Sequence, residues 1–151
     1  MIKGNNIHKH FNNLHVLKGV DINIEKGEFV SIVGDSGAGK TTLLQILGTL
    51  ESPSEDPKSQ LYINNIDISK LNERSLANFR NENIGFVFQF HQLLPEFTAF
   101  ENICIPGYIK KTNTLKLENR AIKLMEYLNL GNKMNNKPNE LSGGEKQRVA
   151  V

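Results

Sequence analysis

The feature that most constrains this chain is a glycine-rich stretch from Gly34 to Thr41, with the sequence GDSGAGKT. It satisfies the pattern G-x-x-x-x-G-K-[ST] at every fixed position. The apolar run Phe29–Val33 precedes it and predicts a buried strand, and a helical segment follows from Lys40. A strand, a glycine-rich loop and a helix in this order predict a phosphate-binding loop in an α/β fold.

Each residue type in this loop has a chemical reason. Glycine permits positive φ and lets backbone N–H groups approach phosphate oxygens without a Cβ in the way. Lys40 is expected to reach the β- and γ-phosphates, and the Thr41 hydroxyl to bind Mg²⁺. A chance glycine-rich turn is the alternative, but such a match arises at only about one position in 10⁴. The candidate nucleotide-binding residues here are Gly34, Asp35, Ser36, Gly37, Ala38, Gly39, Lys40, Thr41 and Thr42.

The segments on either side of the loop predict further elements. Residues 2–11 and 16–25 mix apolar and polar positions around a turn at 12–13, which indicates an antiparallel strand pair that Gly27 ends. The helix after the loop is expected to end near Gly48.

Beyond residue 50, loops and short elements alternate. The predicted segments are a surface loop at 51–60, a strand pair turning at Asn64-Asn65, a polar helix at 72–82, a buried strand at 84–88, a helix with apolar positions from Leu117 to Leu128, and a last helix from about Gly144. Gly131 is expected to cap the helix that precedes it.

Composition argues against several functions. With 18 Lys+Arg against 16 Asp+Glu, the formal net charge is only +2. Proteins whose main partner is nucleic acid usually carry a strong basic excess, so no nucleic-acid partner is expected. No apolar run approaches the roughly 20 residues that cross a bilayer. The single cysteine, Cys104, cannot form an internal disulfide and is expected to be a small buried residue.

A second candidate anion site is the stretch LSGGEKQR, Leu141–Arg148. A serine hydroxyl and two glycine N–H groups at the start of a helix could meet a γ-phosphate. A capping box, with Ser142 as N-cap and Glu145 three residues on, is the simpler interpretation. The two interpretations are compatible, but capping alone does not account for the consecutive Gly143 and Gly144.

The stretch LSGGEKQR resembles the signature motif of the ATP-binding cassette family, in which it follows a phosphate loop as it does here. The resemblance covers the whole chain. It implies an α/β fold of the P-loop NTPase class, with an N-terminal antiparallel β subdomain, a helical signature subdomain and a central sheet that is incomplete. Family members are motor subunits of transporters. Two cassettes form a head-to-tail homodimer, in which the signature of one completes the ATP site of the other.

The resemblance also implies roles for single residues. The signature residues Ser142–Gly144 would contact ATP in the partner's site. Gln89 matches the glutamine of the family's Q-loop, which approaches Mg²⁺ and senses the transmembrane partner. Thr41 and Gln89 are therefore the metal candidates. Phe11 matches the aromatic that stacks on adenine, with Val16 beside it, although a phenylalanine near a strand end serves the core about as often. ATP and Mg²⁺ are the implied cofactors.

Within the family, residues 88–99 (FQFHQLLPEFTA) and the following Glu101-Asn102 are similar to ATP-binding subunits of lipoprotein-releasing systems. The expected protein is peripheral to the cytoplasmic face of a bacterial inner membrane and binds transmembrane permease subunits that move lipoprotein cargo. Macrolide and cell-division cassettes share part of the stretch, so a drug- or peptide-efflux motor is an alternative, and a soluble cassette protein is another. His91 is expected to make a surface contact or to pack against the loop around Gln89, rather than to act in catalysis or bind a metal.

We expect three segments: residues 1–88 as nucleotide-binding core with the β subdomain, 89–143 as Q-loop and helical subdomain, and 144–151 as the start of the signature helix. Family members continue with a strand ending in Asp-Glu and later a switch histidine, and neither follows within the 151 residues. We therefore expect a fragment, or the remnant of a motor gene, with no catalytic residue of its own. Such a chain would bind nucleotide without useful turnover.

Overall fold

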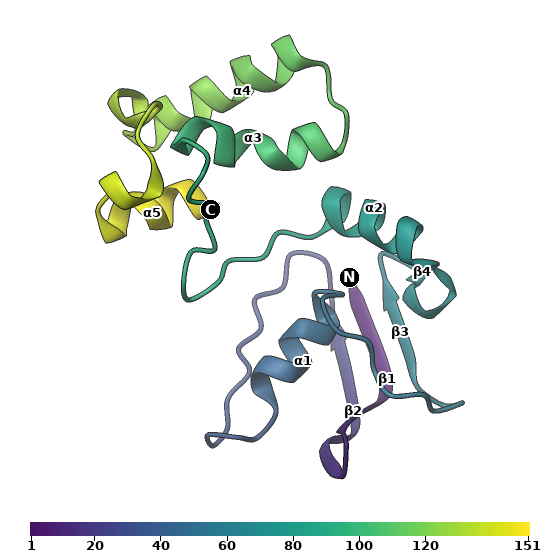
Figure 1. The fold of residues 1–151 in the computed structure, drawn as a ribbon. Coiled ribbons are helices and arrows are strands. Elements are labelled where there is room, and N and C mark those ends of the chain that lie inside the picture. Colours follow the sequence, from purple (N-terminus) through teal and green to yellow (C-terminus); the bar gives the residue numbers. More distant parts are fainter. The chain divides into compact units, whose positions relative to one another are not determined.

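The structure is a computed structural model that describes all residues from 1 to 151. The chain forms two compact units, Met1–Ile84 and Gly85–Val151, whose elements are shown in Figure 1. None of the helices has both the length and the apolar character needed to cross a membrane.

The first unit is built on a four-stranded antiparallel sheet. Its strands lie in the order β2-β1-β3-β4 and are β1 (Ile2–Phe11), β2 (Leu14–Ile24), β3 (Gln60–Ile63) and β4 (Ile66–Asp67). Both predicted strand pairs are confirmed. Their turns place Asn12, Asn64 and Asn65 at positive φ, which asparagine tolerates better than most residues.

Helices α1 (Lys40–Leu47) and α2 (Glu73–Asn83) supply apolar side chains to the core of this sheet, and a short 3₁₀ turn, Ile68–Lys70, follows β4. Gly48 caps α1 as predicted, with its N–H bonded to the carbonyls of Leu44 and Ile46. The buried core consists of Ile7, Leu17, Leu43, Ile46, Leu47, Leu61, Ile63, Ile68 and Phe79.

Two predicted strands are absent, and this corrects the expectation from the sequence. Neither Phe29–Val33 nor Ile84–Phe88 belongs to a sheet, and Phe29 and Val33 are exposed. An apolar run reports a preference for burial, whereas a strand also requires a neighbour whose N–H and C=O groups pair with its own. The four-stranded sheet offers neither segment such a neighbour.

The second unit is helical. It contains α3 (Ala99–Ile109), α4 (Thr114–Tyr127) and α5 (Gly143–Ala150), with 3₁₀ turns at Gly131–Lys133 and Pro138–Glu140. A Cβ on Gly107 would overlap the Leu117 side chain, so this glycine allows α3 and α4 to pack closely. Cys104 is fully buried, as expected. The core consists of Ala99, Met125, Leu130, Leu141 and Val149.

The ends of these helices confirm one prediction and correct another. Helix α4 ends at Tyr127 with Leu128 as its C-cap and Asn129 at positive φ, whereas Gly131, which was predicted to cap the helix, begins a 3₁₀ turn. The start of α5 agrees with the predicted capping box. The same contact, a 2.7 Å bond from a backbone N–H to the glutamate three residues on, recurs at Thr98–Glu101, Lys137–Glu140 and Ser142–Glu145.

Candidate nucleotide-binding site

The glycine-rich loop lies in the first unit, directly before α1, and its backbone is shaped by three glycines. Gly34, Gly37 and Gly39 have φ values of 149°, 82° and 87°. Ala38 N donates to Asp35 O at 3.2 Å, which closes a turn inside the loop. The amides of Ser36, Gly37 and Gly39 have no acceptor within the protein. These N–H groups are therefore free to bind an anion at the helix N-terminus.

Lys40 folds back across this loop. Its Nζ donates to the carbonyl oxygens of Gly34, at 2.8 Å, and Asp35, at 2.6 Å. Both acceptors are neutral, so the full positive charge of the ammonium group remains uncompensated by any carboxylate. An anion held by the loop amides would meet this charge at the same place.

The loop rests on β2 through Gly39. A Cβ at this position would lie 2.9 Å from Leu17 Cδ2 and 3.0 Å from Val16 Cγ1, which is closer than side-chain carbons approach one another. The structure thus brings Val16 and the phosphate loop together. Phe11, at the end of β1, keeps 42% of its surface exposed, with Lys9 Nζ 5.1 Å from the ring centroid. An exposed ring at a strand end is available for stacking.

The signature residues lie in the second unit, at the N-terminus of α5. Ser142 Oγ accepts a 3.3 Å bond from Glu145 N, while Glu145 Oε2 accepts the Ser142 amide. That backbone bond lowers the pKa of Glu145, and Lys133, with its Nζ 3.4 Å from Oε1, acts in the same direction. Gly143 and Gly144 are exposed in the first turn, so their amides face solvent.

Gln89 is also exposed and belongs to the second unit, in the irregular segment before α3. The predicted site residues are therefore divided between the units. The first unit holds Phe11, Val16 and the loop from Gly34 to Thr42, whereas the second holds Gln89 and Ser142–Gly144.

One structural residue of the Q-loop region was missed by the sequence reasoning. Asn102 Nδ2 donates to the carbonyls of Leu94, Phe97 and Thr98 at 2.9–3.1 Å, and its Oδ1 accepts the Leu94 amide at 2.8 Å. The Glu101-Asn102 pair was noted only for its resemblance to a family. An asparagine eight residues after a Leu-Leu-Pro turn gives no local signal of this role.

Comparison with known proteins decides the family. A profile of the ABC transporter family matches residues 17–151. The chain belongs to the ABC transporter family. Its ABC cassette fold also appears in a solved relative, the ATP-binding cassette MJ0796 in its dimeric post-hydrolysis state bound to ADP and Pi. That structure has a TM-score of 0.86 and 40% identity, and the match covers 99% of this chain and 67% of the other.

Two curated relatives of this ABC cassette carry the same name. The lipoprotein-releasing system ATP-binding protein LolD of Bacteroides thetaiotaomicron is 55% identical over 151 residues. The protein of the same name from Porphyromonas gingivalis is 54% identical over the same length. In both cases the match covers 100% of this chain and 68% of the relative.

The residues of the cassette fit the nucleotide that this family binds. A Cβ at Gly39 would press on Leu17 and Val16, so the loop can approach β2 only with glycine there. The Ser36, Gly37 and Gly39 amides lack acceptors, and the Lys40 charge lies across the same loop. Donors without acceptors, beside a cation, are the chemistry that a di- or triphosphate requires.

Proposed function

We propose that this chain is the ATP-binding, energy-coupling part of the motor of a lipoprotein-releasing ABC transporter. The observation that carries the proposal is 54–55% identity, over the whole chain, to proteins named for that activity. The phosphate loop supports this proposal, because its free amides and Lys40 suit the phosphates of a nucleoside triphosphate. The motor would work at the cytoplasmic face of a bacterial inner membrane, bound to permease subunits.

Within the first unit, the loop amides and Lys40 would hold the β- and γ-phosphates, and the Thr41 hydroxyl would be one ligand of Mg²⁺. Gln89 would be the second protein group near the metal. Phe11 would stack on the base, with Val16 along its edge. Bound Mg²⁺ would neutralise developing phosphate charge, which is its usual contribution to phosphoryl transfer.

The signature residues would act on the nucleotide of a second copy. Ser142 Oγ accepts from Glu145 N, and its hydroxyl also donates to the Glu145 carboxylate, so it would turn away from that carboxylate to donate to a phosphate oxygen. The amides of Gly143 and Gly144 would add two donors at a helix N-terminus. The dimeric structures of the MJ0796 cassette support the pairing of two copies. Closure of the dimer on ATP would move the permease partners through the Q-loop region.

A chimera tests the transport function directly. Residues 1–151 of this chain replace the matching part of the Bacteroides thetaiotaomicron relative, which keeps its remaining residues. We expect the chimera to support lipoprotein release from the inner membrane when the native gene is depleted. A chimera carrying Lys40→Ala should fail, and one carrying Lys26→Ala, an exposed lysine outside the site, should succeed. Stable expression of the chimera without any lipoprotein release would contradict the proposed cargo.

A further inference from the structure

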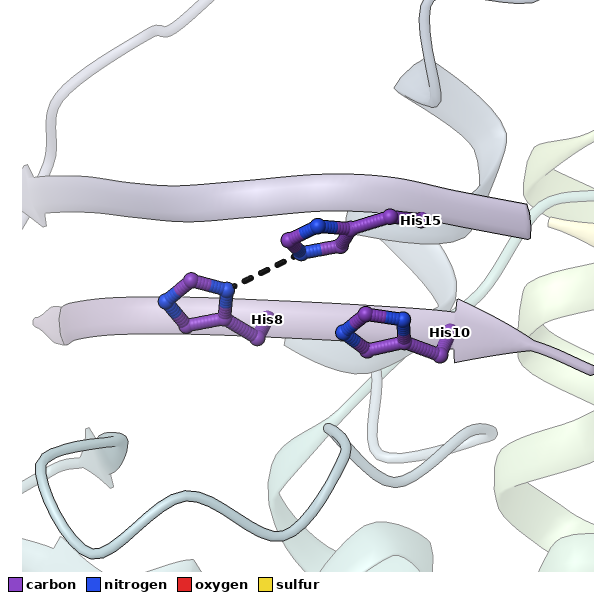
Figure 2. A group of neighbouring side chains, drawn as sticks. All are labelled: His8, His10 and His15. Carbon is purple, nitrogen blue, oxygen red and sulfur yellow. Dashed lines mark hydrogen bonds between the residues drawn. The ribbon is translucent and has the colours of Figure 1, made fainter. Parts of the chain in front are cut away.

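Three of the four histidines gather on the hairpin of β1 and β2. His8 and His10 lie on β1 and His15 on β2, and Figure 2 shows their rings side by side across the two strands. The nucleotide-binding function uses none of them. Their placement follows from the strands: His8 and His10 are two residues apart and share a face, and His15 pairs with His10 in register.

The ring nitrogens are close enough to share one ion. His8 Nδ1 lies 3.0 Å from His15 Nε2, and one ligating nitrogen from each of the three side chains lies within 4.8 Å of the others. Two imidazole nitrogens bound to tetrahedral Zn²⁺ at about 2.0–2.1 Å are roughly 3.4 Å apart. The His8–His15 pair is already near that spacing. His10 is the exposed member of the cluster, and its ligating nitrogen already lies within 4.8 Å of those of the other two.

His8 is held in one orientation by neighbours behind it. His8 Nε2 lies 3.1 Å from Asn6 Oδ1. Asn6 is itself fixed by two hydrogen bonds: Asn6 Nδ2 donates to Asp56 Oδ1 at 3.2 Å, and the Asn6 backbone N donates to Asp21 Oδ1 at 2.7 Å. An amide oxygen can only accept, so His8 Nε2 carries the hydrogen and the Nδ1 lone pair faces His15. Metal-binding histidines are commonly oriented by such a second contact.

Gly19 makes room for this arrangement. It has a φ of 80°, and a Cβ there would lie 3.0 Å from Asn6 Oδ1 and 3.2 Å from His8 Nε2. The His10 and His15 rings stack with centroids 3.8 Å apart and 14° between their planes.

We propose that His8, His10 and His15 form a binding site for a divalent transition-metal ion of the class that prefers imidazole ligands, with Zn²⁺ as the probe. Three protein nitrogens and one water complete a tetrahedral set. The bound ion would join β1 to β2 at the end of the hairpin that carries Phe11. This inference does not depend on the transported cargo or on ATP hydrolysis.

The test is a competition titration of the chain against a chromophoric zinc chelator. His8→Gln, His10→Gln and His15→Gln should each weaken Zn²⁺ binding at least about 10-fold, since each removes a ligand. The matched control is His91→Gln, which changes the one histidine outside the cluster and should leave the affinity unchanged. Asn6→Ala should weaken binding by about 10- to 100-fold without removing a ligand.

Two further measurements distinguish the loss of a metal ligand from the loss of folding. Circular dichroism in EDTA checks that each variant is folded, and Co²⁺ substitution should give the visible bands of a tetrahedral nitrogen site in the unsubstituted chain and His91→Gln only. Equal Zn²⁺ affinity in the three cluster variants and the unsubstituted chain would overturn the proposal. So would loss of binding in His91→Gln to the same degree as in the cluster variants.

Discussion

Gly39 of the phosphate loop lies so close to Leu17 of β2 that a Cβ on the glycine would be 2.9 Å from Leu17 Cδ2. The same residue has a φ of 87°. Two independent constraints, space and backbone conformation, therefore act at one position. The predicted phosphate loop is placed by its packing on the antiparallel sheet as well as by its own turn.

Gly39→Ala and Gly37→Ala separate these two constraints. Both residues have positive φ, but a Cβ on Gly37 would meet nothing within 4 Å. Gly37→Ala should therefore cost only the conformational term, about 1–2 kcal/mol. Gly39→Ala should add an overpacking cost of about 1–3 kcal/mol. Chemical denaturation of the two variants measures the difference, and equal losses would show that the contact with Leu17 is readily relieved.

Lys40→Ala should weaken nucleotide binding. Removing a charge-assisted contact to phosphate costs about 1.5–3 kcal/mol, which corresponds to roughly 10- to 100-fold in affinity. Titration of a fluorescent ATP analogue with Mg²⁺ measures the change. Lys26→Ala is the control, because Lys26 is exposed and outside the loop. A Lys40→Ala variant that binds as tightly as the control would contradict the assignment of this loop.

The 151-residue chain should bind ATP without sustained turnover. Phosphoryl transfer depends on a group that positions and polarises the attacking water, and the only carboxylate among the predicted site residues, Asp35, is assigned to nucleotide binding in the phosphate loop. Steady-state phosphate release from the purified chain should therefore equal that of its Lys40→Ala variant. Sustained release that Lys40→Ala abolishes would show that these residues contain the catalytic group after all.

The capping box of α5 should titrate at low pH. The Ser142 amide holds the pKa of Glu145 below that of an unfolded glutamate. Its stabilisation is therefore complete above about pH 4.3 and is lost as the pH falls through the lower folded value. An NMR titration of the Ser142 amide should follow this protonation, and Glu145→Gln should remove the titration. A midpoint above the ordinary glutamate value would mean that the box does not form.

Asn102→Ala should destabilise the second unit. The substitution removes the donor from three loop carbonyls, of which the Thr98 carbonyl is part-buried and those of Leu94 and Phe97 are exposed, and the net loss of such hydrogen bonds costs about 0.5–1.5 kcal/mol each. Asn119→Ala is the matched control, since Asn119 is exposed on α4 and alanine is the better helix former. Thermal unfolding should show a lower Tm for the first variant only. Equal Tm values would indicate that water replaces the Asn102 amide.

The sequence predicted elements that local chemistry specifies. The hairpin turns at Asn12 and Asn64, helix α1 and the capping box at Ser142 all depend on residues within a few positions of one another. Phe29–Val33 was wrongly predicted as a strand, because pairing depends on residues elsewhere in the chain. Helix α3 was missed, since Pro106 and Gly107 inside it both argue against a helix.

The candidate site likewise has a part that could be recognised from the sequence and a part that depends on the fold. The phosphate loop is contiguous, so its pattern and its glycines could be recognised from the sequence alone. The contact of Gly39 with Val16 joins residues far apart in the chain, and the approach of His15 to His8 depends on strand register. Neither contact could be predicted from the positions of these residues in the sequence. The histidine cluster was overlooked because only the pairing of β1 with β2 brings its members together.

The repeated backbone-to-glutamate bond has a consequence for how the second unit folds. The three contacts, at Thr98, Lys137 and Ser142, each close a segment of four residues. Loops this short form within tens of nanoseconds, far sooner than contacts between distant helices. These local contacts favour the same starting points for α3, α5 and the turn between them whether or not the tertiary packing has formed. The position at which each of these segments begins is therefore specified within four residues of sequence, whereas the persistence of each helix depends on its packing.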